Sequence, residues 1–297
     1  MHSNLQSLSV LSSVFTTFAY GIACYALNPV FFNSIVNDKD PSVFASTLPI
    51  FFGVLFLQFI HEIAHVVSAK QSNIAIGLPV PLPSLEIGTF GSITPLRSFP
   101  PTRTQLFDFA LSGPAITLFL SMVLSVIGIN LTIQTPTDVL TSLPVVPVAL
   151  FKSSFLTGSF VSILAPKIMA LPLSQTVPIH PLFLIGLTGL VSSSLNLLPI
   201  GRLDGGRVVS ALFGRRVAYP LSILTLFFLA IASLTGTSHI TILFGLLVTV
   251  FQRQPEIQVR DEVTDVKGGE GWRLGVYAAT MFLVGLILFP FPGGSPL

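Results

Sequence analysis

The stretch VLFLQFIHEIAHVVSAK, residues 54–70, decides the fold and also raises the question of function. Most of its side chains suit the hydrocarbon of a bilayer, yet His61, Glu62 and His65 lie together near its middle. A charged group at the bilayer centre costs about 2.5–3.5 kcal/mol on insertion scales, and such residues mostly face the interior of a helix bundle. The stretch therefore predicts a membrane-spanning helix with a polar face turned into the protein.

The polar residues of this helix have the spacing H-E-x-x-H. Residues four positions apart lie on one face of a helix, so His61 and His65 can present two imidazole nitrogens to one metal ion. Glu62 lies beside them, within reach of a metal-bound water for which it would act as general base. Three unrelated polar residues at a membrane interface would be the simpler interpretation. The chain has five histidines, however, and two of them fall within five residues, which favours a metal site.

The composition indicates a polytopic membrane protein. Hydrophobic residues make up 51% and charged residues only 9% of the chain, and the mean hydropathy is +0.84. Soluble domains are about 25% charged. A membrane-spanning helix needs about 20 apolar residues. Uncharged runs long enough for this occur at residues 1–37, 41–61, 109–137, 168–201, 217–252 and 274–297.

Two further features of the composition exclude classes of function. The net charge of +2 is too small to indicate nucleic-acid binding. Cys24 is the single cysteine, so the chain has neither a disulfide framework nor a cysteine-based metal site.

The uncharged runs predict an all-α polytopic protein with roughly seven or eight transmembrane helices. Residues 7–27 lack a basic leader and a clear cleavage site, so we expect a span there and not a signal peptide. Residues 71–103 are too rich in proline for a continuous helix. A short helix is expected at residues 206–214. The expected spans are residues 7–27, 44–69, 105–131, 144–165 (the weakest), 180–198, 217–233, 237–251 and 274–291.

A catalytic zinc usually has three protein ligands and one open position. His180, His239 and Asp108 are candidates for the third ligand, but each lies at the edge of an expected span. The best candidate is Asp204 in NLLPIGRLDGGR, residues 196–207, where Pro199 interrupts a helix. Non-helical backbone at membrane depth is tolerated only where protein or a water-filled cavity surrounds it. D-G-G is also an ordinary surface turn, so the motif alone leaves both interpretations open.

The two motifs together resemble those of the site-2 protease family of intramembrane zinc metalloproteases. The family pattern pairs H-E-x-x-H with a distant N-x-x-P-x-x-x-x-D-G-G, and residues 61–65 and 196–206 match both parts. The likeness covers roughly residues 45–290. The plant, algal and cyanobacterial branch, the ethylene-dependent gravitropism-deficient and yellow-green family, is similar at GTFGSITPLRS (88–98), LSGPA (111–115), LFKSSFLTG (150–158), IHPL (179–182) and within residues 252–266.

The resemblance implies a zinc metalloendopeptidase that cuts transmembrane segments of membrane-anchored protein substrates. It implies one Zn²⁺ per chain on His61, His65 and Asp204, with Glu62 as general base. Asn196 would hydrogen-bond the substrate backbone or the developing oxyanion. The segment LEIGTFGSITPL, residues 85–96, corresponds to a short re-entrant β-hairpin that pairs with an unwound substrate as an added strand. We expect its substrate-binding residues to be Gly88, Phe90 and Gly91.

The resemblance also implies domain boundaries and a cellular location. Residues 1–40 would be an N-terminal transmembrane segment, residues 41–291 the catalytic domain with a polar loop at 252–273, and residues 292–297 a tail. That loop carries nine of the 26 charged residues. Plant members carry a transit peptide and a long soluble region, whereas this chain begins almost at a span. A chloroplast thylakoid or envelope membrane is expected, with a bacterial membrane as the alternative.

Two other functions fit a polar cluster within the membrane. A metal sensor or transporter would need several sites along a path, whereas the ligands here reduce to one cluster. A catalytically inactive scaffold related to the protease would have no need for Glu62. Another class of membrane metalloprotease with H-E-x-x-H uses a glutamate as third ligand, and the D-G-G context favours Asp204 instead.

Overall fold

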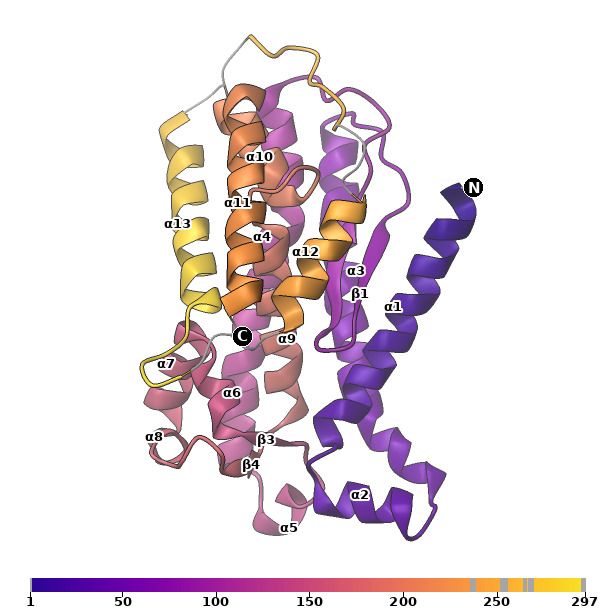
Figure 1. Cartoon of the computed structure of the whole chain (residues 1–297), viewed down its shortest axis with the longest axis vertical. Helices are drawn as coiled ribbons and strands as arrows, with labels where there is room; N and C mark the ends of the chain where they lie inside the picture. The colour runs from indigo at the N-terminus through magenta and orange to yellow at the C-terminus, as the bar shows by residue number, and fades with distance from the viewer. Residues whose placement is uncertain (1, 236–238, 252–255, 264–265, 267–269, 295–297) are drawn as a thin grey trace.

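The computed structural model is a bundle of helices with two short antiparallel sheets (Figure 1). It describes residues 2–294 except 236–238, 252–255, 264–265 and 267–269. The longer helices are α1 (His2–Tyr25), α3 (Leu48–Gln71), α4 (Arg103–Gln134), α9 (Pro181–Asn196), α10 (Asp204–Phe213), α11 (Arg215–Thr235), α12 (His239–Phe251) and α13 (Glu270–Leu288). The shorter ones are α2 (Pro29–Val36), α5 (Thr137–Leu140), α6 (Val148–Lys152), α7 (Phe155–Leu164), α8 (Pro166–Met169) and the 3₁₀ helix η1 (Pro41–Thr47).

Within the described residues, five helical segments are long and apolar enough to cross a membrane, and α7 and α9 are shorter apolar helices. A mostly helical membrane protein is therefore confirmed, whereas the expected number of seven or eight spans is not. The five segments are Gln6–Tyr25, Pro41–Gln71, Arg103–Gln134, Arg215–Leu234 and Gly271–Leu288.

The segment at residues 144–165 is not one helix. Pro144 and Pro147 lack the backbone N–H of a helix interior, and the chain there forms strand β3 (Val145–Pro147) followed by α6 and α7. Strand β3 pairs with β4 (Thr176–Pro178). The expected spans at 217–233 and 237–251 correspond to α11 and α12, and the expected break at Gly236 lies outside the described residues.

Two boundaries differ from the expectation, and a polar interaction lies at each of them. The expected second span begins with η1, whose preceding residue Asp40 accepts a hydrogen bond from the Ser42 backbone N–H at 2.9 Å. This bond and a second one from the Ser42 hydroxyl lower the pKa of Asp40. Helix α13 begins at Glu270, inside the expected polar loop, and the Arg273 guanidinium of its first turn pairs with Asp108 at 3.0 Å.

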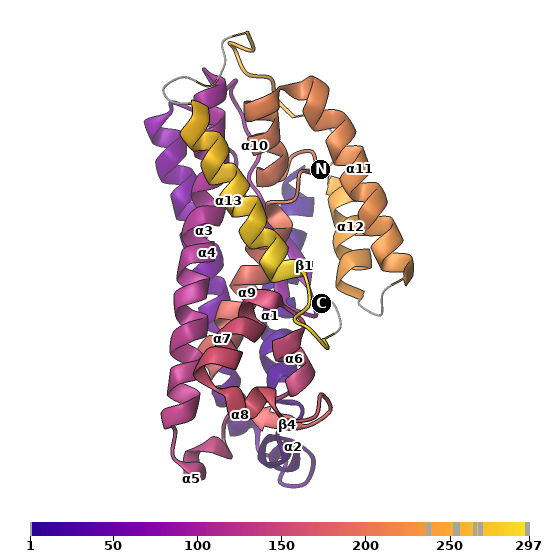
Figure 2. The ribbon, with the colours of Figure 1, turned by 90° about the vertical axis from the view of Figure 1, so that its left-hand side faces the viewer.

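Helix α9 forms the centre of the bundle. Its residues are buried all round, and it packs along α4, which in turn lies beside α3 (Figure 2). Glycines allow α4 and α9 to approach closely: a Cβ at Gly186 would lie 2.6 Å from the Ser121 carbonyl oxygen of α4. Small residues let helix backbones come this near in membrane proteins. The buried helix α9 can therefore deliver Asn196 and the following turn to the middle of the protein.

The hairpin expected in the proline-rich segment consists of β1 (Val80–Ser84) and β2 (Gly88–Ile93). Pro81 faces Ser92 and Pro83 faces Thr89, so one residue of β1 opposes the two residues Phe90 and Gly91 of β2. This is a β-bulge, and Gly91 within it has a positive φ of 98°, which glycine adopts at little cost. Helix α1 packs against the hairpin, which lies between α1 and α12 in Figure 1.

Candidate metal centre

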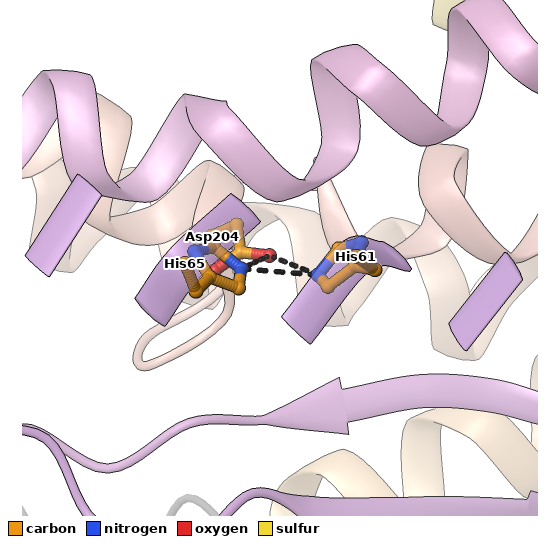
Figure 3. A group of neighbouring side chains, drawn as sticks. All are labelled: His61, His65 and Asp204. Atoms are coloured by element: carbon orange, nitrogen blue, oxygen red, sulfur yellow. Dashed lines mark hydrogen bonds and ion pairs between the residues drawn. The ribbon is translucent and has the colours of Figure 1, made fainter. Parts of the chain in front are cut away.

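Three buried side chains from two helices meet at one point (Figure 3). His61 and His65 come from α3, one helical turn apart, and Asp204 is the first residue of α10. The two Nε2 atoms are 3.0 Å apart, and Asp204 Oδ2 lies 3.3 Å from each of them. Among the described residues this is the one group of three or more His, Cys, Asp or Glu side chains close enough to share a metal ion.

The outer nitrogens of both imidazoles are held by partners that leave Nε2 with its lone pair. The Nδ1 atom of His65 lies 3.0 Å from the Phe109 carbonyl oxygen, which can only accept, so Nδ1 carries the proton. The Nδ1 atom of His61 lies 3.3 Å from the Thr117 hydroxyl. That hydroxyl donates to the Gly113 carbonyl and can accept from His61. Such outer partners orient the imidazoles of metal-binding histidines.

The turn between α9 and α10 places Asp204. A Cβ at Gly205 would collide with the Leu197 carbonyl, and one at Gly206 with the Gly201 carbonyl, so both positions need glycine for α10 to begin against the preceding backbone. The N-terminal end of a helix favours a negative charge. The D-G-G sequence is thus a buried helix start here, not a surface turn.

Gly113 of α4 gives the histidines their space. A Cβ at this position would lie 2.5 Å from His65 Nε2 and 2.8 Å from His61 Nε2. A Gly-Pro pair inside an apolar helix, as at Gly113 and Pro114, predicts only a helix kink or a close-packing point. The structure shows that the packed partner is the pair of candidate ligands.

The donor set fits a zinc ion. Ligand atoms about 2.0–2.1 Å from a tetrahedral zinc lie roughly 3.3–3.4 Å from one another, close to the separations of the three atoms here. With Nδ1 protonated, both Nε2 atoms direct lone pairs toward each other and toward a carboxylate oxygen. These electron-rich atoms repel one another. A cation at the point where they converge would remove this repulsion. His61, His65 and Asp204 are therefore the residues that could hold a metal.

Glu62 lies beside this group and is half-buried. Its Oε1 accepts hydrogen bonds from the hydroxyl of Ser92 and from Gln58 Nε2, and its Oε2 accepts from the Thr94 hydroxyl at 2.7 Å. An open cleft of about 410 Å³ reaches Glu62. The other residues lining it are Val66, Ile76, Gly77, Leu78, Pro79, Thr94 and Arg97. The candidate base is therefore reachable from outside the bundle.

Asn196 lies against the hairpin. Its Nδ2 donates to the Phe90 carbonyl at 2.9 Å and to the Ser192 carbonyl at 3.1 Å. Its Oδ1 is buried and has no hydrogen-bond partner among the described residues. A Cβ at Gly91 would overlap the Asn196 amide, so the bulge and Asn196 fit each other. The Phe90 side chain is fully buried and contacts Phe244, and Gly88 packs against Thr17.

A comparison with protein families matches residues 49–235 to peptidase family M50. The chain belongs to peptidase family M50. The matched residues include His61, Glu62, His65, Asn196 and Asp204, and the match confirms the resemblance to the site-2 protease family inferred from the two motifs.

Several plant proteins are curated relatives of this M50 chain. It is 34% identical over 245 residues to "Probable zinc metalloprotease EGY1, chloroplastic" from Oryza sativa subsp. japonica, covering 82% of this chain and 41% of that protein. The Arabidopsis thaliana protein of the same name is also 34% identical, with 82% and 43% covered. "Probable zinc metalloprotease EGY3, chloroplastic" from rice subsp. indica is 29% identical, with 98% and 49% covered. The chain thus spans two fifths to half of their length. No solved structure matches.

The remaining candidate ligands of the M50 chain lie elsewhere. His180 precedes α9 and accepts a hydrogen bond from the Leu182 backbone N–H through Nδ1 at 3.2 Å. Asp108 pairs with Arg273, and His239 begins α12. Of the two arginines flanking Asp204, Arg207 has Nη1 3.8 Å from Asp204 Oδ1, whereas Arg202 pairs with Glu256 at 4.0 Å.

Sequence reasoning missed the residues that support the centre. Thr117, Ser92 and Thr94 are small hydroxyl residues in apolar segments, where such residues usually bond to their own backbone. One signal was available: Ser92 and Thr94 are two positions apart in a predicted strand and therefore share a face.

Proposed function

We propose that this M50 chain is an intramembrane zinc metalloprotease that hydrolyses peptide bonds in transmembrane segments of membrane-anchored proteins. One observation carries the proposal: His61, His65 and Asp204 converge inside an apolar helix bundle, with the carboxylate of Glu62 beside them. The plant relatives are named probable zinc metalloproteases, and these names support the choice of metal and reaction.

The residues have the following roles in this proposal. His61, His65 and Asp204 would hold one Zn²⁺ per chain. When bound, zinc polarises the scissile carbonyl and makes the attacking water more acidic. Glu62 accepts the proton of that water and passes it to the leaving amine, which is general base followed by general acid catalysis. Asn196, whose Oδ1 has no hydrogen-bond partner among the described residues, would hydrogen-bond the substrate backbone.

The substrate has to be unwound before it is cut, because a regular helix keeps its carbonyls in hydrogen bonds. We propose that the hairpin, at Gly88, Phe90 and Gly91, receives the unwound segment as an added strand. All three residues are buried in this structure, so the elements that cover them would have to move before a substrate strand could pair there. The lipid bilayer is the second partner, and no nucleic acid is expected.

The membrane placement is also a proposal. We expect roughly seven or eight segments to enter the bilayer, the five long helices together with α7, α9 and α12. The catalytic domain would extend over residues 41–291, preceded by the transmembrane segment within residues 1–40. Because the relatives are named as chloroplastic, a chloroplast membrane is the proposed location of this multi-pass protein.

The structure gives less support to the alternatives. A metal transporter needs successive sites along a path, and the described residues contain one such group. An inactive scaffold needs no base, whereas Glu62 is present and lies in an accessible cleft.

Removal of the metal tests the proposal. The purified chain would be placed in proteoliposomes with a reporter that has a single transmembrane segment. We expect a chelator to stop cleavage and added Zn²⁺ to restore it, because water is a poor nucleophile without the metal. Cleavage that continues at the same rate after zinc has been removed, as verified by elemental analysis, would contradict the proposed chemistry.

A further inference from the structure

The carboxylate of Glu62 is held by the hairpin. Ser92 and Thr94 each donate a hydroxyl hydrogen bond to it, one to Oε1 and one to Oε2. Gln58, one turn earlier on α3, also donates to Oε1, at 3.2 Å. A carboxylate with donors on both oxygens cannot rotate or swing without breaking at least one bond. The hairpin therefore determines where the carboxylate of Glu62 lies.

The strand has the register needed for these contacts. Ser92 is the next-to-last residue of β2, and Thr94 follows the strand directly, so their side chains lie on the same side of an extended chain. The bulge at Phe90 and Gly91 adds one residue to β2 and thereby reverses which face Ser92 presents. Without the bulge, a regular strand would turn Ser92 to the opposite side.

Both ends of this segment are anchored to other parts of the candidate centre. Asn196 donates to the Phe90 carbonyl at 2.9 Å, and Arg207 Nη2 donates to the Thr94 carbonyl at 2.8 Å. Arg207 is itself fully buried, and its Nε donates to Glu256 at 2.7 Å. The segment from Phe90 to Thr94 is therefore tied to the helices that carry Asn196 and Asp204.

We infer that Ser92 and Thr94 are positioning residues, which set the carboxylate of Glu62 for proton transfer. The inference rests on the proposed function, since Glu62 is the base only in that mechanism. It makes Ser92 and Thr94 part of the catalytic machinery, in addition to the proposed role of β2 as a surface for substrate. A substrate segment that pairs with the hairpin would then contact the same strand that holds the base.

Variants of the two hydroxyls test the inference. Ser92→Ala, Thr94→Val and the double variant remove the donors with little change in volume. Ser84→Ala is the matched control, because Ser84 is a buried hairpin serine whose hydroxyl accepts from the Ile87 backbone N–H within the hairpin. We expect kcat to fall by roughly ten- to hundredfold in the double variant, as for a misplacement of about 1 Å. KM and zinc content should stay within about twofold of the parent's, as expected when an interaction acts only in the transition state.

Two further measurements separate positioning from a merely structural role. The conservative variants Ser92→Thr and Thr94→Ser keep the hydroxyls and should recover most of the lost kcat. Infrared difference spectra between the parent and Glu62→Gln isolate the carboxylate stretch of Glu62, which the loss of both donors should shift. This spectroscopic readout does not depend on activity, so it remains informative if the protein cleaves no reporter.

The outcomes distinguish the positioning role of Ser92 and Thr94 from the proposed protease function. An unshifted carboxylate band in the double variant, or equal losses of kcat in the double variant and in Ser84→Ala, would overturn the inference. A shifted band in a protein that shows no zinc-dependent cleavage would support the hairpin contact and reject the proposed function, and with it the catalytic role assigned to the contact.

Discussion

Glu62→Gln should reduce cleavage of a membrane-anchored reporter by about 10²–10⁴-fold, the usual contribution of a general base. Glutamine keeps the shape of the side chain and can still bond to the hydroxyls of Ser92 and Thr94, but it cannot accept a proton from water. Glu62 contributes none of the three converging atoms that could bind the metal. The zinc content of the variant should therefore equal that of the parent. Rates in proteoliposomes and elemental analysis of the same preparations measure the two quantities.

A control for this variant is Gln58→Ala, which removes a neighbouring hydrogen-bond donor of Glu62 and leaves the carboxylate in place. We expect it to lose far less activity than Glu62→Gln. Equal cleavage by the parent and Glu62→Gln would show that the proton is taken elsewhere, and the assigned mechanism would then be wrong.

Gly113→Ala should weaken zinc binding by at least about 100-fold, the upper end of what changes around a metal site usually cost. The added methyl group would lie 2.5 Å from His65 Nε2 and 2.8 Å from His61 Nε2, where the two lone pairs converge. It would therefore take the space of the metal, although α4 itself favours alanine over glycine. Titration with zinc against a competing chelator measures the affinity.

Gly275→Ala is the matched control for this substitution. Gly275 also lies within a long apolar helix, α13, but a Cβ there meets nothing within 4 Å. The control should bind zinc like the parent. If Gly113→Ala also binds zinc with the parent's affinity, the metal does not lie between the two histidines.

The sequence predicted the helical membrane fold and the ligand set for physical reasons. The run of apolar residues around HEIAH can be satisfied only by a helix in a bilayer, and the i, i+4 spacing places His61 and His65 on one face whatever the tertiary structure. Helix geometry alone does not predict Asp204 as a candidate ligand, because its position depends on a turn between two helices. The H-E-x-x-H and D-G-G motifs had to be considered together to select it over His180 and Asp108.

Other features depend on contacts between segments that are distant in the chain. The bulge at Gly91 packs against Asn196, which lies more than 100 residues later in the chain. No local sequence pattern predicts this bulge. Thr117 and the Phe109 carbonyl reach the histidines only because α4 packs beside α3. The exact number of spans does not follow from the sequence either, because hydropathy does not distinguish a bilayer-crossing helix from a short buried helix such as α9.

The position of the cut in a single-span reporter tests the central claim most directly. Products formed by the zinc-loaded chain in proteoliposomes would be identified by mass spectrometry, with Asp204→Ala as the metal-site control. The account predicts a cut inside the apolar segment of the reporter, made by the parent and lost in Asp204→Ala. A cut confined to the soluble flanks of the reporter, or one that Asp204→Ala makes equally well, would contradict it.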